Sequence, residues 1–329
     1  MNRTTRLGFF LLMAAFVLPP LARAEEKVLR LGMIGLDTSH VTAFTGYIND
    51  TKNNSGCKVV VGYPGGSPDI DSSWSRVKKY TEELRTKHGL EIVDSIEELA
   101  QKCDAVLLES VDGRPHLKQA KPVIAAKKPL FIDKPMAGNL ADVLEIFRLA
   151  KEAGVPCWSS SSLRFSPGII GMRNDPKVGK VLGCMIHSPC SLNEHHPDLY
   201  WYGVHGAEML FTIIGTGIET VSRTHTADTD LVVGVWKDGR IGTYRGLRKK
   251  SEYGGFVYGD KGIQPVGKYA GYGPLCDEII KFFKTGKAPV PPEETIELFA
   301  FMSAADESKA KGGCPVKIKD VIEKAKAGK

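Results

Sequence analysis

A lysine follows a short apolar run in the middle of the chain, at a place where it could do chemistry. The run 129–132, Pro-Leu-Phe-Ile, is followed by Asp133, Lys134 and Pro135. In open α/β sheets ligands bind at the carboxyl ends of the strands, and a proline ends a central strand. Lys134 is therefore the first candidate for chemistry, although the pattern alone fits a solvated lysine at the end of a strand at least as well.

The elements that must position this lysine alternate regularly up to residue 156. Short apolar runs, typical of strands, cover residues 28–34, 58–62, 91–93, 105–108 and 130–132. One amphipathic stretch, typical of a helix, begins near residue 42. Further stretches of this kind cover 74–88, 96–102, 116–126 and 140–153. Strands that alternate with helices predict a doubly wound parallel sheet, the α/β arrangement of Rossmann type.

After residue 157 the pattern changes to longer strand-like runs separated by turns. These runs cover residues 181–188, 231–236, 240–245 and 255–258, and they predict a second, α+β domain with a largely antiparallel open sheet. Helical periodicity returns over 275–284 and 293–311. We therefore predict a signal peptide (1–24), a Rossmann-like parallel-sheet domain (25–157), an antiparallel-sheet domain (158–275) and carboxyl-terminal helices (276–329) that pack back on both domains.

The first 24 residues have the pattern of an export signal. Arg3 and Arg6 precede the apolar stretch 7–18, and small residues at 22 and 24 offer a cleavage site. We expect an exported protein, periplasmic or secreted, that leaves the cytoplasm unfolded and must find any nucleotide outside it. Without the leader, the chain has 41 basic and 38 acidic residues. This surplus of positive charge is too small to indicate a nucleic-acid partner. The sequence has no second apolar span, so we expect no membrane partner after the leader is cleaved.

Several segments, in their order and spacing, resemble those of the Gfo/Idh/MocA oxidoreductases, which join a Rossmann domain to an antiparallel-sheet domain. The segments are Leu31-Gly32-Met33-Ile34-Gly35-Leu36, Cys103-Asp104-Ala105-Val106 with Pro115-His116, Phe131-Ile132-Asp133-Lys134-Pro135-Met136-Ala137, Ala153-Gly154-Val155-Pro156, Gly203-Val204-His205 and Phe282-Phe283-Lys284-Thr285-Gly286-Lys287-Ala288-Pro289-Val290. The resemblance covers essentially the whole chain after the leader. It implies that residues 25–157 form a dinucleotide-binding domain and that residues 158–275 form a substrate and oligomerisation domain.

The resemblance implies an NAD(P)-dependent oxidoreductase that acts on a sugar or cyclic polyol. Lys134 would orient the substrate hydroxyl and His205 would move its proton, because oxidation of an alcohol needs a base while hydride leaves carbon. The cofactor-binding residues that it implies are Gly35, Asp37, Thr38, Ser39, His40, Tyr63, Gly65, Ser110, His116 and Asp133. It also implies a homo-oligomer, a dimer or tetramer, because the second sheet often mediates assembly in such proteins.

The chain departs from the family pattern in three segments. A dinucleotide loop needs Gly-x-Gly-x-x-Gly, but Asp37 and His40 replace its second and third glycines, and a carboxylate repels pyrophosphate. In the alternative interpretation, a residue of this loop simply caps the following helix. The ribose-binding acid expected after the second strand is absent from Tyr63-Pro64-Gly65-Gly66-Ser67. Trp201 stands four residues before His205, where a catalytic aspartate is usual.

Aromatic residues near His205 indicate a surface for a sugar ring. Tyr200, Trp201 and Tyr202 can stack on such a ring, and we assign them with Arg164 to substrate binding. The acids and histidines at 194–198, 205 and 208 follow no standard ligand spacing, so no metal is expected.

Three functions therefore stay open. The first is the NAD(P)-dependent oxidoreductase. The second is a redox-neutral carbohydrate-active enzyme, such as a lyase, hydrolase or isomerase, and the third is a non-catalytic carbohydrate-binding protein. The broken glycine loop and the predicted export favour the last two.

Overall fold

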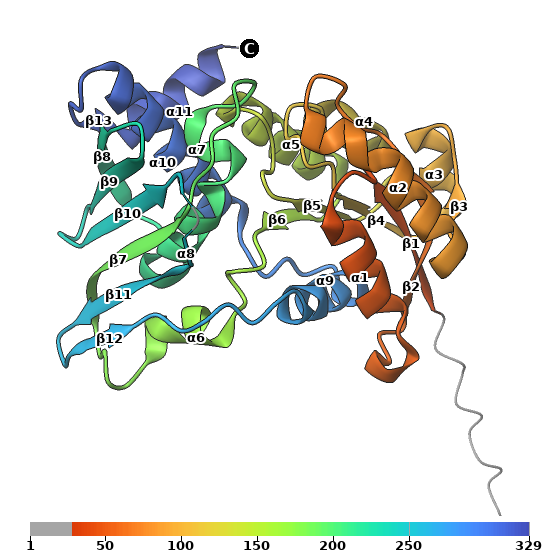
Figure 1. The fold of residues 1–329 in the computed structure, drawn as a ribbon, viewed down its shortest axis with the longest axis horizontal. Coiled ribbons are helices and arrows are strands. Elements are labelled where there is room, and N and C mark those ends of the chain that lie inside the picture. The colour runs from red at the N-terminus through yellow and green to blue at the C-terminus, as the bar shows by residue number, and fades with distance from the viewer. Residues whose placement is uncertain (1–27, 250, 329) are drawn as a thin grey trace, which may run out of the picture.

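Six parallel strands form the sheet of the amino-terminal domain (Figure 1). The computed structural model describes residues 28–249 and 251–328, so the predicted leader lies outside the described residues. The strand order β3-β2-β1-β4-β5-β6 is that of a dinucleotide-binding sheet, which confirms the predicted fold. The strands are β1 (Leu29–Ile34), β2 (Cys57–Tyr63), β3 (Glu91–Ile92), β4 (Ala105–Leu108), β5 (Leu130–Asp133) and β6 (Cys157–Ser160). The sheet thus extends to Ser160, beyond the predicted domain end at residue 157.

Helices cover both faces of this sheet because alternate side chains of its strands point to opposite sides. In β1, Leu31 and Met33 pack in one apolar cluster with α1, α2 and α9, whereas Ile34 packs in another with α3, α4 and α5. The helices are α1 (Ser39–Asn49), η1 (Thr51–Asn53), α2 (Asp71–His88), α3 (Ile96–Lys102), α4 (His116–Ala125), α5 (Leu140–Ala153) and α9 (Gly273–Thr285).

A seven-stranded sheet forms the second domain, in the order β12-β11-β7-β10-β9-β8-β13. Its strand pairs are antiparallel except β7 with β10, so the prediction of a largely antiparallel sheet is confirmed. The strands are β7 (Val181–Pro189), β8 (Ile218–His225), β9 (Thr229–Trp236), β10 (Ile241–Leu247), β11 (Gly254–Gly259), β12 (Ile263–Pro265) and β13 (Val316–Lys317). The sequence patterns did not predict β8, β12 or β13.

Helices α8 and α10 pack against one face of the second sheet. The other helices of this part are short or peripheral, and among the described residues no helix is both long and apolar enough to cross a membrane. The helices are α6 (Pro167–Ile170), η2 (Gly171–Asn174), α7 (Asp198–Trp201), α8 (Val204–Ile214), α10 (Pro292–Ala310) and α11 (Ile318–Ala327).

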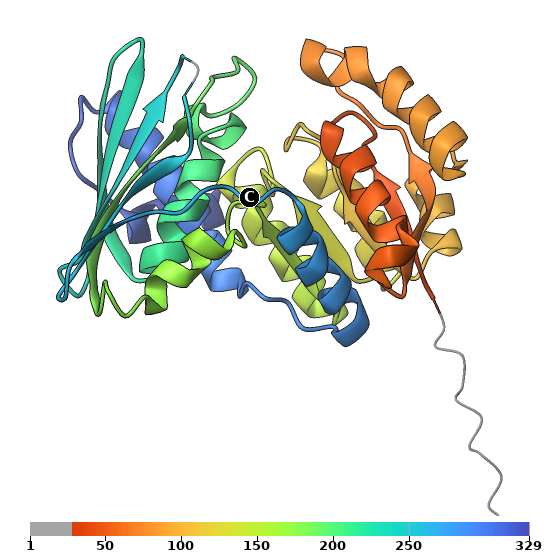
Figure 2. The same cartoon turned by 60° about the horizontal axis from the view of Figure 1, so that its bottom comes forward.

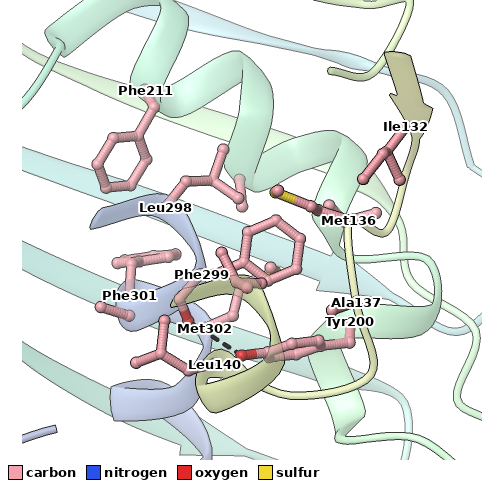
Figure 3. Close-up of a cluster of buried hydrophobic side chains, with 14 of the residues drawn as sticks. Ile132, Met136, Ala137, Leu140, Tyr200, Phe211, Leu298, Phe299, Phe301 and Met302 are labelled. Carbon is pink, nitrogen blue, oxygen red and sulfur yellow. Dashed lines mark hydrogen bonds between the residues drawn. The ribbon is translucent and has the colours of Figure 1, made fainter. Parts of the chain in front are cut away.

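One hydrophobic cluster joins the two domains (Figure 3). Met136 and Leu140, just beyond β5, meet Phe211 of α8 and Phe299 of α10 in this cluster. The hydroxyl group of Tyr200 donates a hydrogen bond to the backbone carbonyl of Phe299 at 3.3 Å. Because protein cores are close-packed, the packing of this hydrophobic cluster fixes how the carboxyl edge of the first sheet faces the second domain.

Candidate active site

A cleft of about 500 Å³ lies where the carboxyl edge of the first sheet faces the second domain. The segment before α9 crosses from the second sheet back to the first domain (Figure 2) and brings two tyrosines to the cleft. Its walls are strongly polar, which suits a hydroxylated ligand. The lining residues are Thr38, Ser39, His40, Ser72, Arg76, Val111, Lys134, Ser162, Leu163, Ser191, Trp201, Tyr202, His205, Tyr253, Tyr269 and Tyr272.

Lys134 lies at the carboxyl end of β5, as predicted, and lines the cleft with only 9% of its surface exposed. The peptide bond between Lys134 and Pro135 is cis. The positive charge of Lys134 lowers the pKa of the neighbouring His205. A largely desolvated ammonium group beside an imidazole can hold an oxygen atom of a ligand in place.

His205 lies in the first turn of α8, and its Nδ1 atom is 2.7 Å from the hydroxyl oxygen of Ser161. Burial, and then the charges of Lys134 and His40, hold the pKa of His205 well below its usual value. The imidazole is therefore neutral at neutral pH and able to accept a proton. The structure brings the predicted pair Lys134 and His205 together, and their catalytic roles stay predictions.

The four residues assigned to substrate binding divide into two groups. Trp201 and Tyr202 line the cleft, and the ring of Tyr202 lies 5.0 Å from that of His205. Tyr200 is 1% exposed, and its hydroxyl group is 2.7 Å from that of Ser303, inside the core. Arg164 is buried between Glu208 and Glu294. The structure thus places Tyr200 and Arg164 in packing and ion pairs away from the cleft wall.

The start of the phosphate loop keeps the geometry of a dinucleotide-binding turn. Gly35 has φ +83°, and a Cβ atom there would lie 2.2 Å from the hydroxyl oxygen of Ser110, so only glycine fits. Thr38 is the cap of α1: its side chain accepts a hydrogen bond from the backbone N–H of His40 at 3.5 Å. Ser39 and His40 then line the cleft.

Asp37 closes the loop in a way that does not suit a pyrophosphate. Its carboxylate is fully buried and accepts hydrogen bonds from the hydroxyl of Ser73 at 2.6 Å and the backbone N–H of Val111 at 3.0 Å. It therefore bridges the loops after β1 and β4, the crevice where a dinucleotide lies in such sheets. Burial raises the pKa of Asp37, and the hydrogen bonds only partly oppose this. The usual pyrophosphate site does not fit NAD or NADP here.

Two of the other predicted cofactor residues, Tyr63 and Gly65, line a neighbouring cavity of about 520 Å³. Gln119 lines the same cavity, and its side chain is 3.0 Å from the hydroxyl group of Ser110. His116 is fully buried, with its Nε2 atom 2.9 Å from the backbone carbonyl of Ser110. Ser110 and His116 line neither this cavity nor the cleft.

Two buried acids lie directly beneath the cleft. The Nδ1 atom of His40 is 2.6 Å from a carboxylate oxygen of Asp133, and this pairing lowers the pKa of Asp133 although burial alone would raise it. Glu109, at the end of β4, is fully buried, and burial followed by the charge of Asp133 raises its pKa well above the usual value.

Glu109 and three tyrosines of the cleft, Tyr253, Tyr269 and Tyr272, were not predicted from the sequence. Glu109 follows the apolar run 105–108 just as Lys134 follows the run 129–132, so the same argument could have found it. Tyr269 and Tyr272 lie in an irregular segment that carries no periodic signal. Their position depends on how the chain crosses between the domains.

Comparisons with known proteins agree with this architecture. Residues 29–161 match the model of the Gfo/Idh/MocA oxidoreductase family, described as having an NAD-binding Rossmann fold. None of the curated proteins matches the sequence.

Solved structures share the fold over both domains at low sequence identity. A probable dehydrogenase from Thermotoga maritima is 21% identical, with a TM-score of 0.75, and the match covers 89% of this chain and 100% of that one. A scyllo-inositol dehydrogenase from Lactobacillus casei is 12% identical (TM-score 0.73; 89% and 99% covered). An oxidoreductase from Agrobacterium radiobacter, solved with NAD+, L-tartaric acid and magnesium, is 14% identical (TM-score 0.71; 89% and 99% covered). The described chain therefore shares the two-domain fold of these solved proteins, and its residues 29–161 are similar to the NAD-binding Rossmann domain of the Gfo/Idh/MocA oxidoreductase family.

Proposed function

We propose that the protein is an enzyme that acts on a hydroxyl group of a sugar or cyclic polyol, with Lys134 and His205 as its proton-transfer pair. The observation that carries this proposal is the position of a neutral imidazole and a desolvated ammonium group in one polar cleft. Lys134 would hold the hydroxyl oxygen, and His205 would accept its proton. Trp201 and Tyr202 would contact the ring of the ligand.

The family match supports oxidation of the hydroxyl group as the reaction, with NAD or NADP as the family's cofactor. Similar folds in an inositol dehydrogenase and in an oxidoreductase bound to NAD+ support the same class of reaction. The position of Asp37 supports the second candidate, a redox-neutral enzyme on the same scaffold. Predicted export supports that candidate too, since a chain exported unfolded carries no nucleotide with it.

Nucleotide analysis separates these candidates. We would denature the purified protein, assay the supernatant for NAD(H) and NADP(H), and titrate native protein with NADH and NADPH. We would then offer a panel of inositols and sugars with each oxidised nucleotide and follow reduction by absorbance. Bound nucleotide and turnover would support the oxidoreductase, whereas folded protein without either would exclude it and leave redox-neutral chemistry or simple binding.

Replacement of Asp37 by Asn should improve nucleotide binding. Asn keeps the shape and can still bond to Ser73 and Val111, but it removes the negative charge from the pyrophosphate position. We expect the Kd for NADH to fall about tenfold in Asp37→Asn, as the like-charge repulsion is relieved. Asp69→Asn, at an acid exposed on the surface, is the control and should leave the Kd unchanged. Equal affinity of the two variants would mean that Asp37 does not oppose the nucleotide.

We also propose that the open face of the second sheet pairs with a second copy of the chain. On this face the strand register places Val233, Thr243, Met185 and Phe256 in one row across four strands. Met185 and Phe256 are 39% and 44% exposed, and Ile241 is 50% exposed in the next row. Adjacent apolar side chains of this kind are typical of an interface.

A charge in this row should separate the copies. We expect Phe256→Glu to lower the molar mass measured by light scattering from that of a dimer or tetramer to that of one chain, because the new carboxylate would be desolvated in the interface. Thr226→Glu adds the same charge at the exposed turn between β8 and β9 and should not change the mass. Wild-type protein that is monomeric at high concentration would contradict this proposal.

A further inference from the structure

Three carboxylate oxygens beneath the cleft are buried without a hydrogen-bond partner among residues 28–249 and 251–328. They are both oxygens of Glu109 and the Oδ1 atom of Asp133. The two side chains are 0% and 2% exposed, so water does not reach them from the surface. An ionised carboxylate is stable in such a place only beside a compensating proton or cation.

His40 completes this group with an imidazole. One ligand atom each of His40, Glu109 and Asp133 can be chosen so that all three lie within 4.8 Å of one another. The centre of such a triangle lies within about 2.8 Å of every corner, and metal–ligand bonds of about 2.0–2.2 Å are reached by side-chain shifts of less than about 1 Å. The geometry is therefore close to that of a bound ion.

The charges of the neighbourhood also favour a cation. Glu109 lies within the influence of two other acids, Asp133 and Asp37. Lys134 supplies one positive charge here, which is fewer than the acids around it. A divalent ion would balance the remaining carboxylates better than the lysine can alone.

We propose that His40, Glu109 and Asp133 bind a divalent transition-metal ion such as Zn²⁺ or Mn²⁺. An imidazole and two carboxylates suit these ions, and the imidazole makes them preferable to Mg²⁺ and Ca²⁺. Three protein ligands leave coordination positions open, as in catalytic metal sites. Of the three residues His40 lines the cleft, so the proposed ion would lie beside the ligand space that Lys134 and His205 also line.

The proposal goes beyond the polyol chemistry above and does not depend on it, because metal binding can be measured without a substrate. If both hold, the ion would meet hydroxyl oxygens of the ligand at the floor of the cleft. An ion in that position would also lower the pKa of a bound hydroxyl group, whose proton His205 would accept.

Calorimetric titration tests the site. Purified protein is treated with a chelator, dialysed, and titrated with ZnCl₂, MnCl₂ and MgCl₂ separately. We expect one Zn²⁺ or Mn²⁺ per chain, bound at least tenfold more tightly than Mg²⁺. Glu109→Gln and His40→Gln should each weaken binding about 100-fold, and a saturating ion should raise the Tm of the wild type by about 5 °C. That rise should be absent in Glu109→Gln.

A second buried pair of an imidazole and a carboxylate serves as a matched control. His196 and Asp112 form this pair, 2.9 Å apart, outside the proposed site. His196→Gln should bind the ion as the wild type does. The proposal is overturned if folded wild-type protein binds none of the three ions, which would leave a proton shared between Glu109 and Asp133. It is equally overturned if Glu109→Gln and His40→Gln, both folded by circular dichroism, bind the ion with wild-type affinity.

Discussion

Lys134→Met should reduce turnover about 10³-fold on any sugar or polyol that the wild-type protein converts. Methionine fills a similar volume but cannot hold a hydroxyl oxygen or stabilise the charge that develops when the proton leaves. Proton-transfer groups contribute about 10²- to 10⁴-fold to catalysis, which sets the expected size. The measurement is kcat and KM for the variant and the wild type on the substrate found by screening. The main loss should be in kcat.

A second readout follows from the charge of the lysine. Because Lys134 helps to hold the pKa of His205 down, its removal should move the imidazole titration, followed by NMR, toward the usual value. Lys134→Arg keeps the charge and should leave that titration low. Lys121→Met, at an exposed position of α4, is the control for general effects of losing a lysine. Unchanged turnover in a folded Lys134→Met protein would remove Lys134 from the mechanism.

The same variant separates catalysis from binding. A carbohydrate-binding protein without enzymatic activity would show no turnover in the wild type and would keep its ligand affinity in Lys134→Met. An enzyme would lose turnover while part of the affinity remained, because Trp201 and Tyr202 still line the cleft. Affinity and turnover should therefore be measured on the same preparations.

The first domain could be predicted well because its strands are buried on both faces and its helices have clear ends. The predicted helices over 96–102 and 140–153 agree with α3 and α5 at both ends. The side chain of Ser95 accepts a hydrogen bond from the N–H of Glu98, and Gly154 ends α5 in the left-handed conformation. Such local signals are readable in sequence.

The second domain was less predictable because several of its contacts join distant parts of the chain. Strand β8 contains Arg223, which is 1% exposed and paired with Asp230, so its pattern does not look like that of a half-buried strand. Strand β13 has two residues and exists through its pairing with β8. Neither strand has a local signal that periodicity could detect.

Site residues divide in the same way. Lys134 could be found because a buried strand must deliver the next residue to the ligand edge. Arg164 was assigned to substrate binding together with the aromatic residues near His205, and no local pattern reveals its partners in the structure. These are Glu208 and Glu294, 44 and 130 residues away in the chain. Only the packing of α8 against α10 brings them to Arg164.

Arg164→Met should destabilise the protein by about 3–5 kcal/mol. Arg164 is 6% exposed; its Nε atom pairs with Glu208, and its Nη1 atom lies 2.6 Å from Glu294. Removal of the arginine leaves two carboxylates buried without their main partner, which is the costly way to break a buried ion pair. Urea unfolding followed by circular dichroism measures the change in the free energy of unfolding.

Arg148→Met is the matched control because Arg148 also pairs with two glutamates, Glu145 and Glu152, but on the surface of α5. Surface ion pairs contribute at most about 1 kcal/mol, so this variant should unfold almost like the wild type. If the two variants lost equal stability, burial of the Arg164 cluster would not be the reason for its contribution to stability.

Replacement of all three charged residues of the cluster tests what stability requires. It requires either the charges themselves or only that no buried charge is left without a partner. In the triple variant Arg164→Met, Glu208→Leu, Glu294→Leu, no carboxylate of the cluster remains to be desolvated. We expect it to recover most of the stability lost in Arg164→Met, because apolar side chains of similar volume often replace a buried ion cluster at little cost. Recovery of stability with unchanged ligand binding would place Arg164 in the support of the fold. Recovery of stability with lost binding would return Arg164 to the substrate site.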